Sequence, residues 1–121
     1  MPDLRPNPTL CLEYRAEQPI HHAFLEQAGR CPDATAILAR HTRCSYAQLA
    51  QISQGIAAHL VENAASGTDR VVIVASRCAA LVYAMLGCLR AGLAFTVADA
   101  AYPPARIGQV IRTLAPAGVL R

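Results

Sequence analysis

The chain has 121 residues, which suits one domain, and 54 % of them are apolar while only 16 % are charged. Ordinary soluble domains carry about 25 % charged residues, so this composition predicts a piece that packs against further protein. The net charge of +3 rests on arginines alone, which are scattered from Arg5 to Arg121 and form no basic run. This scatter argues against a nucleic-acid partner.

Residues 1–18 hold several prolines and no hydrophobic periodicity, which predicts a flexible lead-in before a folded unit over 19–121. Met1–Arg15 lacks the apolar core of a signal peptide, and the uncharged, strongly apolar run Cys78–Leu89 is too short to span a bilayer. We therefore expect a cytoplasmic chain with no membrane partner.

A helix and a hairpin are predicted first. Pro19 suits a helix start, and apolar residues at helical spacing continue to about Arg30. A short apolar strand at 34–39 follows, and a turn at Arg40-His41 leads into a second strand at 42–44.

The next helix has a clear beginning. Ser45, with Gln48 three residues later, forms a capping box, and the helix is expected to run to about Asn63. Apolar residues lie on one face of this helix. They are Leu49, Ile52, Ile56 and Leu60.

The second half predicts a parallel sheet. The apolar run 71–75 is typical of a parallel strand covered on both faces, a helix over 77–91 ends at Gly92, and 94–97 is the next strand. We expect the stretch 78–89 of this helix to be buried on nearly all sides, because it has no polar face.

One more helix and one more strand follow. Pro103-Pro104 begins a helix that Pro116 ends, and 118–120 begins a strand. The apolar stripe of this helix consists of Ile107, Val110, Ile111 and Leu114.

Four stretches resemble, in order and spacing, the start of the adenylation domains of nonribosomal peptide synthetases, which are adenylate-forming enzymes. They are IHHAFLEQAGRCPDATAI (20–37), CSYAQLAQISQGIAAHL (44–60), DRVVIVASRCAALVYAMLGCLRAG (69–92) and LRAGLAFTVADAAYPPARI (89–107). The last stretch is the most specific, because several of its residues fall in register with a family motif. These are Ala91, Gly92, Ala94, Asp99, Tyr102, Pro103 and Arg106.

The resemblance implies an α/β fold, with a partial parallel sheet and flanking helices that form the first part of the large N-terminal subdomain. It implies a portion of a domain that makes aminoacyl adenylates from ATP. This chain departs from the family pattern in three ways. Gln48 replaces Glu, and Val97 and Ala100 replace the prolines around Asp99. Arg90 replaces Lys, which we expect to matter little at a solvated helix end.

The chemistry of adenylate formation needs groups that this sequence lacks. It contains no lysine, and its glycines are isolated, so the family's catalytic lysine and phosphate loop are missing. We therefore assign no catalytic, cofactor-binding or metal residue, expect no activity in isolation, and attribute ATP and Mg²⁺ to the complete domain. Asp99 and Tyr102 either shape the loop after their strand or contact a ligand there.

The expected partner is the remainder of an adenylation domain or another synthetase domain. The alternative is a non-catalytic interaction or docking module for a synthetase. In either case we expect an exposed apolar face, centred on helix 107–114 and Leu120, which also allows homo-oligomers.

The histidines do not predict a metal site. His21 and His22 are adjacent on a helix and point different ways. His41 and His59 have no Cys or His at ligand spacing.

The five cysteines are expected to be free thiols, because no export signal is visible. Cys78 and Cys88 are too far apart on one helix to form a disulfide. Cys31 and Cys44 bracket the hairpin, so a disulfide between them is the alternative to free thiols, and a reducing compartment disfavours it. Cys11 lies in the lead-in and is a candidate surface thiol.

Overall fold

The computed structural model describes residues 9, 17–65 and 67–121. The lead-in predicted over 1–18, with Cys11, therefore lies almost wholly outside the described residues. The helices and strands are, in chain order, α1 (His22–Arg30), β1 (Thr35–Ala39), β2 (Thr42–Ser45), α2 (Tyr46–Asn63), β3 (Arg70–Ala75), α3 (Ala79–Arg90), β4 (Ala94–Asp99), α4 (Pro104–Leu114) and β5 (Gly118–Leu120).

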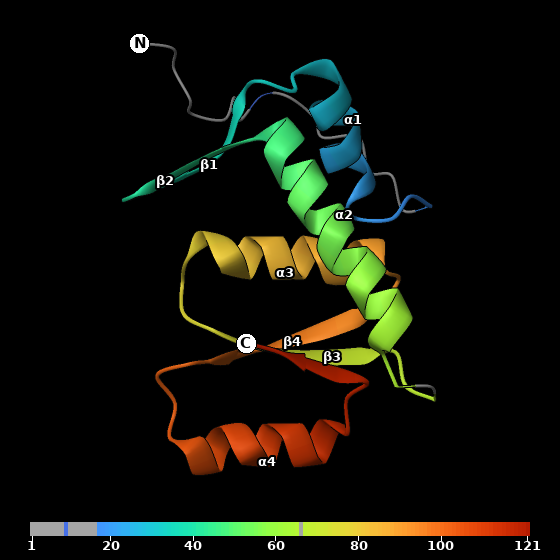
Figure 1. Ribbon diagram of the computed structural model, residues 1–121, viewed down its shortest axis with the longest axis vertical. Coiled ribbons are helices and arrows are strands. Elements are labelled where there is room, and N and C mark those ends of the chain that lie inside the picture. Colours follow the sequence, from blue (N-terminus) through green and yellow to red (C-terminus); the bar gives the residue numbers. More distant parts are fainter. Residues whose placement is uncertain (1–8, 10–16, 66) are drawn as a thin grey trace.

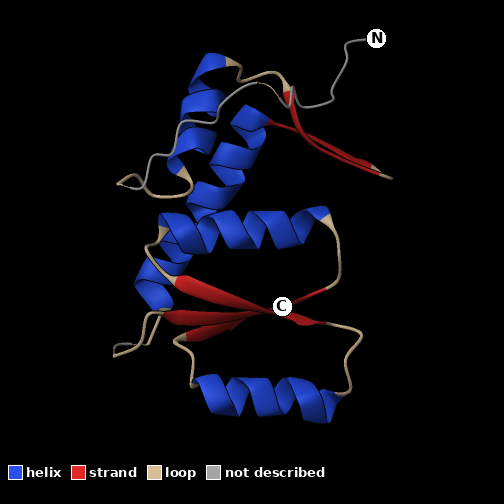
Figure 2. Cartoon of the chain, turned by 180° about the vertical axis from the view of Figure 1, so that it is seen from behind, coloured by secondary structure: helices blue, strands red, loops and turns tan. Residues whose placement is uncertain are grey.

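The predicted α/β fold is confirmed. Strands β4, β3 and β5 form a parallel sheet in that order, with β3 in the centre. Figure 1 shows α3 on one face of this sheet and α4 on the other, and the view from behind agrees (Figure 2). The hairpin of β1 and β2 is a separate antiparallel pair that projects from the far side of α3.

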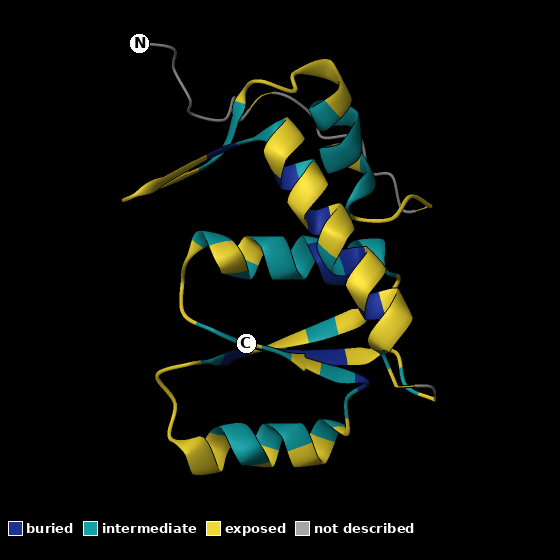
Figure 3. Ribbon diagram, viewed as in Figure 1, coloured by how far each residue is buried: buried dark blue, intermediate teal, exposed yellow. Residues whose placement is uncertain are grey.

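The core lies where β3 meets α2 and α3. Val71, Val72 and Ile73 are at most 2 % exposed, as the continuous apolar run predicts for a central parallel strand. Leu60 of α2 and Cys88 of α3 pack in the same cluster as Val71 and Ile73. Figure 3 shows these buried positions gathered on the central strand and at the α2–α3 crossing.

Helix α2 begins as its sequence predicts. Ser45 Oγ accepts a hydrogen bond from the Gln48 N–H at 3.2 Å, and Gln48 Oε1 accepts one from the Ser45 N–H at 2.9 Å. The expected apolar face is only partly correct, because Ile52 is 38 % exposed. The buried face instead consists of Leu49, Ser53, Ala57 and Leu60, since small residues let α3 approach closely.

Gly87 permits that close approach. An added Cβ at Gly87 would lie 2.7 Å from the Cβ of Ile56, which is closer than two such carbons can be. The two helices therefore touch backbone to side chain at this point, and Gly87 and its neighbour Cys88 are the buried residues of α3.

Arg90 completes the contact between α2 and α3. Its Nη1 donates to the Ala50 carbonyl at 2.6 Å and to Ser53 Oγ at 2.9 Å, and its Nη2 donates to Gln54 Oε1. The expectation of a solvated helix end is therefore wrong. The planar guanidinium satisfies three acceptors on α2 at once, which a lysine ammonium does less well.

The expected burial of α3 is also wrong for most of its length. The helix begins at Ala79, later than predicted, and Val82 is 36 % exposed while most of its other residues are half-buried. The reason is geometric, because α2 crosses only the C-terminal part of α3. The N-terminal part borders an apolar hollow of about 280 Å³ that includes Tyr83 and Leu120.

The remaining turns follow the sequence. Gly92 has φ of 73°, the left-handed conformation predicted to end α3. Ala115 has φ of 42° and ends α4 just before Pro116, although the left-handed region disfavours a side chain. The apolar stripe of α4 faces the sheet but none of its residues is fully buried.

Helix α1 is shorter than predicted. It begins at His22 and not at Pro19, and it packs on α2 through a stack of Phe24 on Tyr46, whose ring centres lie 6.0 Å apart. The hairpin turns at Arg40 and His41 as expected.

Candidate functional site

The carboxyl ends of β3 and β4 form the edge where an open parallel sheet usually binds ligands. Strand β4 ends at Asp99, whose Oδ1 accepts a hydrogen bond from the Ala101 N–H at 2.9 Å. The Tyr102 N–H donates to the Asp99 carbonyl at 3.0 Å. Asp99 therefore holds the loop between β4 and α4, which is the loop-shaping role that the sequence suggests.

A hollow of about 390 Å³ lies beside this loop, between the sheet and α4. Tyr102, which is 49 % exposed, lines it together with Val74 and Ile107. Arg121 is the charged residue in its lining. The arrangement offers an aromatic ring, apolar walls and one cation, which suits contact with a chain or ligand but supplies no acid–base pair.

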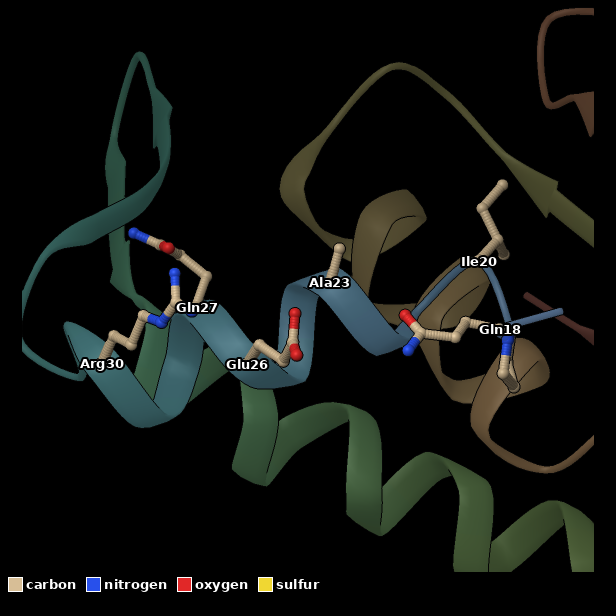
Figure 4. Close-up of a pocket in the computed structure, with 7 residues that line it drawn as sticks. Gln18, Ile20, Ala23, Glu26, Gln27 and Arg30 are labelled. Carbon is tan, nitrogen blue, oxygen red and sulfur yellow. The ribbon is translucent and has the colours of Figure 1, made fainter. Parts of the chain in front are cut away.

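A second hollow, of about 340 Å³, lies along α1 and the segment before it (Figure 4). Glu26 and Arg30 are its charged residues, and Ile20, at the opposite end of the hollow from Arg30 in Figure 4, is 79 % exposed. Glu26 Oε1 lies 3.6 Å from His22 Nε2. The residues that line this hollow come from one stretch of sequence, so it is a surface groove of α1 and the segment just before it.

A third hollow, of about 250 Å³, lies where β2, α2 and α3 meet, and Tyr83 and Cys44 line it. Burial raises the pKa of the Tyr83 hydroxyl, and a hydrogen bond with Cys44 raises it further. In the core cluster, burial raises the pKa of the Cys88 thiol to about 11, so this thiol stays protonated and unreactive.

The four described cysteines are free, as predicted. Cys31 and Cys78 are exposed, whereas Cys44 and Cys88 are buried. The disulfide considered between Cys31 and Cys44 is not formed.

The histidines make local contacts. His22 pairs with Glu26 on α1, and His59 Nδ1 lies 3.2 Å from Asn63 Nδ2 on α2. Among the described residues, His, Cys, Asp and Glu form no group of three that could hold a metal ion. In the part of the chain that the structure describes, every helix is too short or too polar to traverse a bilayer.

Two features of this region were missed by sequence reasoning. Arg90 and its acceptor Ala50 lie 40 residues apart, so no local pattern reveals their contact. The hollow beside Tyr83 exists because Ile52 faces outward, whereas the helical periodicity predicted that Ile52 faces the core. The small residues Ser53 and Ala57 lie on the face of α2 that is buried. Their small size was the signal in the sequence that could have identified this face.

A model of the AMP-binding enzymes matches residues 24–121. The chain belongs to this family. The order and spacing of the four stretches in the sequence are explained by this membership, and the predicted resemblance to the N-terminal segment of synthetase adenylation domains is confirmed.

Relatives of two kinds are similar to this chain. L-2-aminoadipate reductase of Schizosaccharomyces pombe is 36 % identical over 110 residues, covering 84 % of this chain and 8 % of the relative. Tyrocidine synthase 2 of Brevibacillus parabrevis is 37 % identical over 95 residues, covering 78 % of this chain and 3 % of the relative. The chain thus spans only a small part of the curated proteins that it matches.

A solved structure shares the fold. The four-domain nonribosomal peptide synthetase holo-AB3403, bound to AMP and glycine, is 28 % identical with a TM-score of 0.76. The match covers 85 % of this chain and 8 % of that one. The AMP-binding fold and the position of this chain in its N-terminal subdomain are therefore established by sequence and structure together.

Proposed function

We propose that this chain is the first structural layer of an amino-acid-activating adenylation domain in nonribosomal peptide biosynthesis. In the complete domain, a carboxylate oxygen of the amino acid attacks the α-phosphorus of ATP, the bond to the β-phosphate breaks, and pyrophosphate leaves. The product is an aminoacyl adenylate. Mg²⁺ offsets the negative charge of the phosphates in this step.

The observation that carries this proposal is the state of the parallel sheet. Strands β4 and β5 each have β3 as their strand neighbour, and within the described residues their outer edges have no strand beside them. Val97 on β4 and Val119 on β5 are 40 % and 37 % exposed. Open edges and exposed apolar residues are what a sheet shows when further protein covers it.

The proposed role is to support the catalytic groups and not to supply them. The sequence has no lysine and no glycine-rich loop. Asp99 uses its carboxylate to hold the loop after β4, and Arg90 binds α2 with its guanidinium. The charged groups of Asp99 and Arg90 thus stabilise the fold through hydrogen bonds within the chain.

Calorimetry with ATP and Mg²⁺, together with amino-acid-dependent pyrophosphate exchange, tests the lack of activity in the chain alone. We expect no heat of binding and no exchange above background. Saturable ATP binding with a dissociation constant in the micromolar range would contradict the proposal.

A chimera tests the positive part of the proposal. Residues 24–121 would replace the matching stretch of an adenylation domain of tyrocidine synthase 2, with a deletion of the same stretch as the control. We expect the chimera to exchange pyrophosphate and the deletion to be inactive. A folded, soluble chimera without exchange would instead favour a docking module that never serves adenylate formation.

A further inference from the structure

The β1–β2 hairpin projects away from the body of the molecule (Figures 1 and 2). Its base is packed, because Cys44 is 3 % exposed, whereas Leu38 near its tip is 80 % exposed. Residues 39–43 are exposed as well. A strand pair of this kind presents backbone hydrogen-bonding groups and an apolar side chain to solvent.

The charge of this region has one sign. Between Asp33 and Glu62 the sequence contains no acidic residue, while the hairpin carries Arg40 and Arg43. Arg43 Nε donates to the hydroxyl of Thr35 at 2.8 Å, so its described partner is neutral. The positive charge of Arg43 is thus not balanced by a carboxylate among the described residues.

The two sides of the hairpin differ. On the β1 side, Ala36 and Ile37 border an apolar groove shared with α1 and α3. On the β2 side, Arg43 and Cys44 border the hollow of about 250 Å³. The free edge of β2 therefore opens onto a surface that combines a cation with apolar and amide groups.

The exposed isoleucine of α2 belongs to this surface. Ile52 is 38 % exposed and lines the hollow with Gln51 and Tyr83. The helical periodicity of α2 predicts that Ile52 is buried. A further segment that binds over the hollow would bury this side chain.

We propose that the free edge of β2 binds an extended acidic segment of a partner protein, which adds a strand to the hairpin. A carboxylate of the segment pairs with Arg43, and an apolar side chain covers Ile52 in the hollow. Backbone hydrogen bonds supply affinity, and the alternation of acidic and apolar side chains supplies specificity.

Charge selects this occupant over a second copy of the chain. Antiparallel pairing of two β2 edges about a two-fold axis would bring two Arg43 side chains toward each other. Like charges that face each other across strands are destabilising, whereas opposite charges attract. The inference rests on the hairpin and the hollow alone and does not depend on adenylate formation.

Fluorescence anisotropy tests the proposal with the full chain and a short labelled peptide in which Glu and Val alternate. We expect saturable binding, and we expect Arg43→Glu to weaken it at least about tenfold. Arg112→Glu is the matched control, because Arg112 is an exposed residue of α4 on the other side of the sheet. This variant should bind as the unmodified chain does. Circular dichroism verifies that both variants fold.

Two further probes make the result decisive. A peptide with Lys in place of Glu should not bind, and amide exchange at residues 42–45 should slow when the acidic peptide is bound. Tighter binding of a single-stranded oligonucleotide than of the acidic peptide would overturn the proposal. It would equally be overturned by peptide binding that Arg43→Glu leaves unchanged, or by no binding at all.

Discussion

The two faces of the parallel sheet differ in how completely helices pack on them. On one face, α2 and α3 bury Leu60 and Cys88 against β3. On the other face, α4 lies against the sheet with no fully buried residue of its own. The same three strands therefore carry one more fully packed layer and one less fully packed layer, which is the arrangement expected of a piece of a larger domain.

The central strand shows how this difference arises. Side chains of a strand alternate between faces, so Val71 and Ile73 enter the cluster beneath α3 while Val72 points to the side of α4. The β3 side chains are therefore buried on both faces of the sheet. The two faces differ in their helices, because α3 also contacts α2, whereas α4 has the sheet as its chief neighbour.

Truncating one isoleucine on each side gives the largest expected contrast. Ile73→Ala, at 2 % exposure, should lower the free energy of unfolding by about 2–5 kcal/mol. Ile111→Ala, on half-buried α4, should cost about 1 kcal/mol, because solvent already reaches that side chain. Urea unfolding followed by circular dichroism measures both values. Equal losses would mean that α4 packs as fully as α3.

The close contact of α2 with α3 is tested by adding one methyl group. Gly87→Ala should destabilise the chain by about 1–3 kcal/mol, because the new Cβ collides with Ile56. Gly55→Ala on α2 is the matched control, since its new Cβ meets nothing, and it should stabilise the helix by about 0.5–1 kcal/mol. Melting temperatures that rise in both variants would disprove the close contact.

Arg90 sharpens the same comparison at the charged end of α3. Arg90→Lys should cost about 1 kcal/mol, because one ammonium replaces a planar group that serves three acceptors. Arg106→Lys, on the exposed side of α4, should stay within about 0.5 kcal/mol of the unmodified chain. Denaturant midpoints distinguish these outcomes. An equal, negligible change in both variants would show that the contacts of Arg90 with α2 do not stabilise the chain.

The pH dependence of stability gives the smallest effect. Burial raises the pKa of the Cys88 thiol from 9.0 to about 11, so the folded chain holds this proton more tightly than the unfolded chain does. The resulting stability is fully present below pH 9 and is lost as the pH rises from 9 to about 11. Cys88→Ala should reduce this decline. A decline of the same size in both proteins would show that other groups cause it.

Local patterns in the sequence predicted much of the fold. The capping box at Ser45, the apolar run of β3 and the left-handed Gly92 each depend on neighbouring residues, and all three are found. Contacts between distant segments were not predicted. Ile52 and Arg90 were misplaced because helical periodicity identifies an apolar face but not which helix packs on it, or at which angle.

Amide hydrogen exchange of the full chain tests most directly whether the α3 face of the sheet is packed more fully than the α4 face. The account predicts that amides of α4 exchange at least about tenfold faster than those of β3 and the C-terminal half of α3, through local opening of α4. Equal protection of α4 and α3, both exchanging only by global unfolding, would contradict it and show a self-sufficient domain.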